Sequence, residues 1–199
     1  MQKIEDIATL ETLYEAPSAR SITKVATHLT PHYRRWISAA RFCILSTVGP
    51  EGTDATPRGD DGPVVHIADD RTIWLPDWRG NNRLDALRNI VRDGRVSLMF
   101  MIAGNDTVIR VNGSALVTAE ASVTKFFDKK SALPRSVVVI SVAEVYFQCA
   151  KALMRSRLWT ATDTPDVPSP GQFLRERDEA FNAEGYDAGY VEYARPLFW

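Results

Sequence analysis

Residues 75–84 carry side chains that could bind an anion. This segment joins the expected end of a strand to the expected start of a helix, and the first turn of a helix presents free N–H groups and a positive dipole. Gly80 lets the backbone approach a ligand closely. Arg79 and Arg83 oppose the helix dipole unless an anion sits between them. The alternative is that Asn81 or Asn82 caps a surface helix whose arginines are solvated.

Arg58 is a second candidate anion ligand. It follows Pro57 and precedes Gly59 at the end of an expected strand. From there its guanidinium could reach across the sheet toward the possible anion site at residues 75–84. The alternative is a loop arginine that pairs with Asp60 or Asp61.

A third basic group comprises Lys151 and Arg155, which lie four residues apart on one face of an expected helix. Like charges at this spacing repel each other unless an anion or carboxylates lie between them. Trp159 could stack on a planar ring. The alternative is a basic surface turn beside a core tryptophan.

The sequence contains no recognisable nucleophile–base pair, paired carboxylates or Walker glycine loop, so its catalytic residues are unknown. A site rich in arginine and aromatic residues without a general base suits a cofactor that brings its own chemistry.

Composition excludes several classes of protein. The 199 residues include 24 basic and 25 acidic side chains, a balance that argues against a nucleic-acid-binding protein. No apolar run approaches the roughly 20 residues that span a bilayer. Residues 1–10 lack the pattern of a signal peptide, so we expect a cytoplasmic protein. Cys43, Cys149 and the three histidines have no metal-ligand spacing, so we expect neither a disulfide nor a metal site.

The pattern of apolar residues divides the chain into three parts. Residues 1–40 form an N-terminal helical segment, residues 41–159 a strand-rich domain, and residues 160–199 a proline-rich linker followed by an arm. Strands are expected at 42–48, 54–57, 64–68, 72–75, 96–103, 107–117 and 135–147. Helices are expected near 4–17, 18–28, 31–40, 84–94, 122–130 and after Cys149.

Six or seven short strands joined mainly by tight turns favour antiparallel pairing, because parallel neighbours need long crossovers. We therefore expect a mainly β protein with added helices (α+β). A closed or split barrel is the simplest such arrangement, since closure removes exposed sheet edges.

Several segments together resemble a known family. They are FCILSTVG at 42–49, DATPRGD at 54–60, TIWLPD at 72–77, RGNNR at 79–83, RVNG at 110–113 and CAKA at 149–152, followed by Arg155-Ser156 and Leu158-Trp159. This set is similar to the pyridoxamine 5′-phosphate oxidase-like group of FMN-binding split-barrel proteins, in particular to its branch of probable FMN-dependent enzymes. The resemblance implies a six-stranded antiparallel Greek-key split β-barrel with flanking helices. It also implies a homodimer with FMN at the subunit interface.

The resemblance assigns roles to individual residues. Arg79, Asn82 and Arg83 would hold the FMN phosphate, and Arg58 and Asp77 would lie nearer the ribityl chain or ring. Asn82 and Arg83 stand where the oxidase carries an Arg-Lys pair, so Arg79 or Arg58 has to replace the missing charge. The segment with Lys151, Arg155 and Trp159 would approach the flavin, from the same or the partner subunit. The pyridoxal-phosphate-binding residues of the oxidase have no clear match here.

The function that follows is an FMN-dependent oxidoreductase that moves a hydride between flavin and a nicotinamide or small organic substrate. A second hypothesis is a non-catalytic flavin-binding or stress-response module. A third is a barrel that uses a deazaflavin or haem, in which His66 is the strand histidine that could ligate haem. The alternative for His66 is a packed strand residue.

Overall fold

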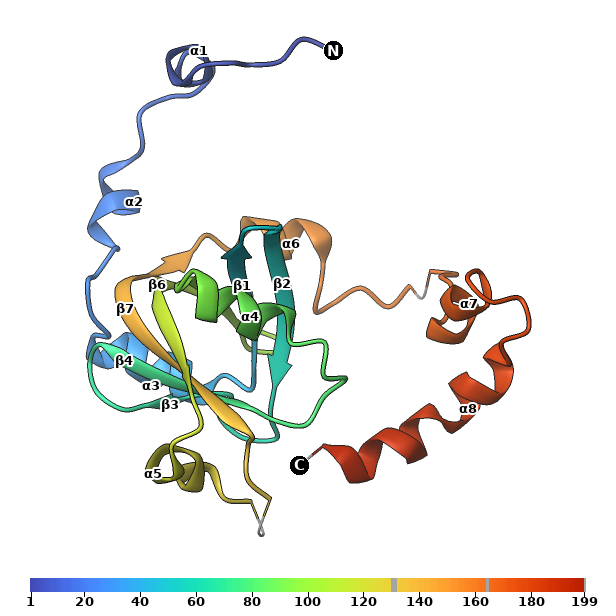
Figure 1. Cartoon of the computed structure of the whole chain (residues 1–199). Helices are drawn as coiled ribbons and strands as arrows, with labels where there is room; N and C mark the ends of the chain where they lie inside the picture. The colour runs from blue at the N-terminus through green and yellow to red at the C-terminus, as the bar shows by residue number, and fades with distance from the viewer. Residues whose placement is uncertain (130–131, 164, 199) are drawn as a thin grey trace.

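Seven strands form one antiparallel sheet in a computed structural model that describes residues 1–129, 132–163 and 165–198 (Figure 1). The order of neighbours across the sheet is β2-β1-β5-β6-β7-β4-β3. The strands are β1 (Phe42–Gly49), β2 (Gly52–Gly59), β3 (His66–Ile67), β4 (Thr72–Asp77), β5 (Arg95–Met101), β6 (Val108–Thr118) and β7 (Ser136–Gln148). The mixed α+β class and the antiparallel pairing are confirmed.

The seventh strand is a difference from the six-stranded barrel that the resemblance implies. β3 contains only His66 and Ile67, which pair with β4 at the edge of the sheet. Val64 and Val65, which we expected in this strand, are buried before it begins, and the Val64 N–H donates to the carbonyl of Ala40. The Greek-key winding stays a prediction.

Contacts between distant strands show that the sheet curls back on itself as a barrel does. Arg58 on β2 forms an ion pair with Asp77 on β4, although four strands separate β2 and β4 in the sheet order. This curvature brings the ends of two strands from opposite parts of the sheet into one site.

Alternate residues of each strand build the core inside this curled sheet. Cys43 and Leu45 on β1, Leu98 and Phe100 on β5, and Val111 on β6 are completely buried. This period of two is the strand pattern on which the sequence prediction rested.

The helix α4 (Asp85–Arg92) lies against β1 and interrupts the strands as predicted. Ala86, Asn89 and Ile90 form its buried face, whereas Val91 is 76% exposed. The face includes a polar residue because the Asn89 amide donates to the Thr47 hydroxyl at 3.1 Å. Burial of an amide with such a partner costs little folding stability.

The N-terminal segment contains the helices α1 (Ile7–Glu11), α2 (Ala19–Thr23) and α3 (Pro31–Ala39). α3 begins at Pro31 after Thr30, as predicted. α1 and α2 are shorter than expected and contain no buried residue, and Figure 1 shows them on an arm that leads away from the barrel. Short helices without a packing surface gain little stability. The apolar pattern at residues 4–13 therefore gives only one helical turn.

The remaining helices are α5 (Ala121–Thr124), η1 (Lys125–Phe127), α6 (Lys151–Ser156), α7 (Pro170–Arg175), α8 (Ala183–Ala194) and η2 (Arg195–Leu197). α5 and η1 replace the single helix expected at 122–130, of which Lys130 lies outside the described residues. The expected linker that begins at residue 160 is followed by α7, which a capping box of Ser169 and Gln172 starts. The three-part division of the chain stays a prediction. In the described parts of the chain, no helix has both the length and the apolar character needed to cross a membrane.

The buried thiol of Cys43 predicts a change of stability with pH. Burial raises its pKa from 9.0 to about 12. Above pH 9 the unfolded chain ionises this thiol while the folded chain keeps it protonated, so stability is full below pH 9 and falls as the pH rises toward 12. We expect urea unfolding to show a loss of up to about 1.4 kcal/mol per pH unit from this group.

The comparison of two variants isolates this effect. Cys43→Ala should reduce the slope of unfolding free energy against pH between 9 and 11, whereas Cys149→Ala, at an exposed thiol, should keep the wild-type slope. Equal slopes in all three proteins would contradict the prediction.

Candidate functional site

A groove of about 1380 Å³ runs along β2 and over the ends of β4 and the beginning of α4. Its walls come from β2, the loop after β4, the first turn of α4, the start of β7 and the C-terminal segment. Ligand pockets for small molecules usually measure about 300–1,000 Å³, so this groove is larger than a single small ligand needs. Five of the eight residues expected to bind the cofactor line it: Arg58, Asp77, Arg79, Asn82 and Arg83.

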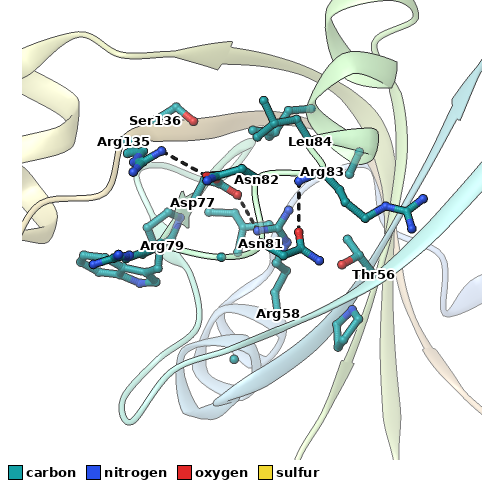
Figure 2. A pocket seen from close by; sticks show the side chains of 18 of the residues that line it. Thr56, Arg58, Asp77, Arg79, Asn81, Asn82, Arg83, Leu84, Arg135 and Ser136 are labelled. Atoms are coloured by element: carbon teal, nitrogen blue, oxygen red, sulfur yellow. Dashed lines mark hydrogen bonds and ion pairs between the residues drawn. The ribbon is translucent and has the colours of Figure 1, made fainter. Parts of the chain in front are cut away.

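The loop at residues 79–84 gives the groove its shape (Figure 2). Asn82 and Leu84 adopt left-handed backbone conformations, with φ of 59° and 62°. Leucine pays a steric cost of about 1–2 kcal/mol in this conformation, and such strain gathers at functional sites. The two turns bring the chain abruptly to the start of α4.

The capping residue of α4 differs from the prediction. Leu84, not Asn81 or Asn82, occupies the N-cap position, and its side chain makes no capping hydrogen bond. The Asn81 carboxamide instead accepts a hydrogen bond from the backbone N–H of Arg83 at 3.1 Å, because the left-handed turn at Asn82 holds it back from the helix. The first turn of α4 therefore lines the groove, and within the described residues no side chain accepts a hydrogen bond from its N–H groups.

Arg58 and Asp77 meet in the floor of the groove. A guanidinium nitrogen of Arg58 lies 2.5 Å from a carboxylate oxygen of Asp77, and the two side chains are only 21% and 14% exposed. The Nε of Arg58 is buried and has no hydrogen-bond partner in the described part of the chain. A buried polar atom of this kind is rare and calls for an acceptor.

Two other arginines supply the positive charges that remain available to bind an anion. Arg79 has no carboxylate partner among the described residues, and Arg135 donates to the Asn82 side-chain oxygen at 3.1 Å (Figure 2). Arg83 forms an ion pair with Asp85 at 2.8 Å, where both side chains are largely exposed. The cations best placed to bind an anion are therefore Arg79 and Arg135, with Arg83 partly neutralised.

Arg135 is a functional candidate that sequence reasoning missed. It lies 53 positions from Asn82 and comes to the site because Ser136, at the start of β7, pairs with Asp77, at the end of β4. These strands are not consecutive, so no short sequence pattern reveals their pairing. The sequence has 18 arginines and 6 lysines, and this surplus of arginine is a signal that could have drawn attention to it.

Asp60 organises the far end of the groove. Its carboxylate accepts hydrogen bonds from Lys129 and, at 3.1 Å, from the indole N–H of Trp78. Lys129 also donates to Asp61 at 2.7 Å, and this hydrogen bond holds the pKa of Asp61 below its ordinary value. Asp60 and Asp61 therefore pair with Lys129, not with Arg58, which was the alternative considered for that arginine.

Lys151, Arg155 and Trp159 do not line the groove. Lys151 and Arg155 are exposed on α6, and the indole of Trp159 donates to the carbonyl of Asn105 at 3.0 Å. Their approach to a flavin stays a prediction, and within one chain the structure does not bring them to the other candidates.

His66 also lies outside the groove. Its ring packs 5.4 Å from that of Trp74 and 4.0 Å from that of Phe126, between ring centres. Burial and the nearby Arg34 lower its pKa. This environment favours the packed strand residue over a haem ligand. Across residues 1–129, 132–163 and 165–198, no three His, Cys, Asp or Glu side chains gather where they could hold a metal ion.

Comparisons with known proteins agree with this architecture. The family model described as pyridoxamine 5′-phosphate oxidase matches residues 29–149. A variant of HupZ from Group A Streptococcus has 18% identity to the chain and a TM-score of 0.50, and the match covers 60% of this chain and 99% of that one. At this identity the likeness extends to the fold alone.

Two further structures are similar over about the same region. A putative pyridoxamine 5′-phosphate oxidase from Lactobacillus delbrueckii is 20% identical, covers 61% of this chain and 95% of its own, and has a TM-score of 0.49. An FMN-binding protein from Syntrophomonas wolfei is 17% identical, with 56% and 79% covered and a TM-score of 0.44. No curated protein matches the chain.

Proposed function

The chain belongs to the pyridoxamine 5′-phosphate oxidase family, and from that premise we propose that its groove binds FMN and that the loaded protein is an oxidoreductase. The observation that carries this proposal is the set of groups at the start of α4 that could bind an anion. There, a helix without a side-chain cap faces the groove beside Arg79 and Arg135, which have no carboxylate partners in the described chain. A phosphate monoester satisfies both the helix N–H groups and the guanidinium groups.

The residues of the groove fit the parts of FMN in order. Arg79, Arg135 and the first turn of α4 would hold the phosphate, and Asn82 and Arg83 would border it. Arg58 and Asp77, in the floor, would lie against the ribityl chain or the ring, where the buried Nε of Arg58 needs an acceptor. The presence of Asn82 in place of a cation is then compensated by Arg79 and by Arg135, which directly precedes β7.

Bound FMN would supply the hydride chemistry of the proposed reaction. The chain itself would bind and orient the cofactor and exclude water from one face of it. The groove carboxylates Asp60, Asp61, Asp77 and Asp85 are held in ion pairs, so none of these four is free to act as a general base. We therefore expect a reaction in which none of these four carboxylates moves a proton.

Reduction of the FMN-loaded protein by NADH or NADPH tests the oxidoreductase part of this proposal. In anaerobic stopped-flow experiments we expect at least one nicotinamide to bleach the flavin absorbance, followed by reoxidation with a small organic acceptor. A flavin that binds stoichiometrically but is reduced by neither donor and turns over with no acceptor would favour the non-catalytic flavin-binding module.

We also propose that the protein is a homodimer with FMN at the subunit interface. Both arms carry large apolar side chains that are exposed in a single chain, among them Leu13 and Ile22 before the barrel and Phe173 and Tyr193 after it. Exposed apolar surface of this extent is typical of protein–protein interfaces. An arm that leads away from its own barrel can cover these side chains on a neighbouring subunit.

Removal of residues 171–199 is expected to weaken the dimer, because the aromatic side chains of that arm would no longer be buried by the partner. Sedimentation equilibrium of the full chain and of the shortened chain measures the two dissociation constants. We expect the constant to increase at least tenfold, and an unchanged constant would contradict the arm's role in dimerisation.

A further inference from the structure

We infer that two copies of the chain meet through the outward side of β1, β5, β6 and β7, where Arg110 of each copy forms an ion pair with the partner's Glu144. The inference rests on the proposed homodimer and names the surface and the charges through which its barrels join. Neither the groove nor the two arms supplies a residue to this ion pair.

The alternation of side chains along the strands separates this outward side from the core. On β1, Cys43 and Leu45 are buried in the core, so Ile44 between them points outward. The helices α3 and α4 contribute Ile37 and Ile90 to the same core and therefore lie on the inward side. The outward side of these strands is consequently the one that another molecule can approach.

A row of partly exposed side chains crosses the outward side from strand to strand. Its members face one another in register: Ile44 on β1, Met99 on β5, Arg110 on β6 and Tyr146 on β7. Met, Arg and Tyr are enriched where proteins contact each other. At one end of the row, Ile44 faces Pro57 on β2, which lines the groove. A copy seated on this row therefore stands beside the groove, as FMN at a subunit interface requires.

A polar row lies next to the first and fixes Glu144. The Ser97 hydroxyl donates to the side-chain oxygen of Asn112 at 2.6 Å, and the Asn112 amide donates to one carboxylate oxygen of Glu144 at 2.7 Å. In the described parts of the chain, no group donates to the other carboxylate oxygen. Glu144 is thus held on the outward side with one oxygen available to a partner.

Arg110 and Glu144 are charges that their own chain does not neutralise. The guanidinium carbon of Arg110 lies 5.3 Å from the centre of the Tyr146 ring, and among residues 1–129, 132–163 and 165–198 neither Arg110 nor Glu144 forms an ion pair. Lys24 also lies over the Tyr146 ring and adds positive charge on that side. A partner that covers these groups must bring a carboxylate to Arg110 and a cation to Glu144, because a buried charge without a counter-charge is costly.

A second copy of the chain brings both charges in the required arrangement. Arg110 faces Tyr146 across β6 and β7, and Glu144 lies two residues from Tyr146, so Arg110 and Glu144 are diagonal neighbours roughly 7–8 Å apart. A two-fold axis that passes between them places each of the two opposite the other residue of the partner. Both ion pairs then form together, and a shifted register would bring like charges together.

Sedimentation equilibrium of the full chain with saturating FMN tests this pairing by single charge reversals. Arg110→Glu brings carboxylates together across the interface, and Glu144→Arg brings guanidinium groups together. We expect each variant alone to raise the dimer dissociation constant by at least about 100-fold, since opposed like charges strongly disfavour association. The matched control is Arg35→Glu, at an exposed arginine on α3, and its constant should stay within threefold of wild type.

An equimolar mixture of the two variants separates lost pairing from lost structure. In a mixed dimer, the carboxylates of the Arg110→Glu chain meet the guanidinium groups of the Glu144→Arg chain, so both ion pairs return. We expect the dissociation constant of the mixed dimer, measured with one variant fluorescently labelled, to return to within about tenfold of wild type. Mixing would not repair a fold that the substitutions had damaged.

The outcomes distinguish this inference from the proposals on which it rests. Dissociation constants like wild type in both variants, or a mixture that dimerises as weakly as its components, would overturn the pairing alone. A wild-type chain that binds FMN and stays monomeric would overturn the proposed dimer and the pairing, and would leave the FMN site. A chain that dimerises with the expected charge dependence but takes up no FMN would support the pairing and overturn the proposed cofactor.

Discussion

Replacement of Arg79 by alanine is expected to weaken FMN binding by about 10- to 100-fold. Arg79 lines the groove and has no carboxylate partner among the described residues, so its full charge is available to the cofactor phosphate. A hydrogen bond to a charged group contributes about 1.5–3 kcal/mol, and each 1.4 kcal/mol corresponds to a factor of ten in affinity. Titration of the apoprotein with FMN, followed by the quenching of flavin fluorescence, measures the change.

Arg135→Ala should have a similar effect, because Arg135 meets the same loop through Asn82. Arg83→Ala should weaken binding less, since Arg83 is 76% exposed and shares its charge with Asp85. If both arginines contact one phosphate, the double variant of Arg79 and Arg135 should lose less FMN affinity than the product of the two single-variant factors.

The matched control is Arg92→Ala, on α4. Arg92 lies in the last turn of α4, pairs with Glu51 and does not line the main groove. Its removal changes the net charge by the same amount as removal of Arg79. Equal losses of FMN affinity in Arg79→Ala and Arg92→Ala would show that general charge, and not the site, governs binding.

Asp77→Ala is expected to lower the free energy of unfolding by about 3 kcal/mol, the lower part of the range for breaking a buried pair. Asp77 neutralises Arg58 at 2.5 Å, and the pair joins β2 to β4 where the sheet curls back on itself. Without Asp77, the Arg58 guanidinium stays in the groove floor with an unpaired charge and a second unsatisfied nitrogen beside its Nε. Urea unfolding followed by circular dichroism measures the loss.

Two further variants identify the cause of that loss. Asp85→Ala removes a carboxylate from an exposed pair and should cost less than about 1 kcal/mol. The double variant Arg58→Met with Asp77→Leu should recover most of the stability, because an apolar pair of similar volume replaces the ion pair without leaving a buried charge. If Asp77→Ala and Asp85→Ala lower the free energy of unfolding equally, the Arg58–Asp77 pair does not hold the curled sheet together.

The sequence predicts most of the strands because their signals are local. Turn residues such as Gly49 and Gly52 separate β1 from β2, and alternate buried residues such as Cys43 and Leu45 mark the inward face. The segment at 79–83 was identified for the same reason, since a strand, a glycine and a helix follow one another directly.

The rest of the site depends on contacts between residues far apart in the chain. Arg58 pairs with Asp77, not with Asp60 or Asp61, because the curvature of the whole sheet brings β2 to β4. Arg135 enters the site through the pairing of β7 with β4. The position of the N-cap at Leu84 depends on left-handed backbone conformations at Asn82 and Leu84. Local preference disfavours this conformation for leucine.

The proposal that the groove binds FMN is tested most directly by the visible spectrum and flavin content of the purified full chain. We expect a yellow protein with the absorption bands of oxidised flavin, or a colourless apoprotein that takes up one FMN per chain when the cofactor is added. FMN should bind more tightly than riboflavin, which lacks the phosphate that Arg79, Arg135 and α4 would hold. A protein that takes up no added FMN, or one that binds FMN and riboflavin equally well, would contradict the account.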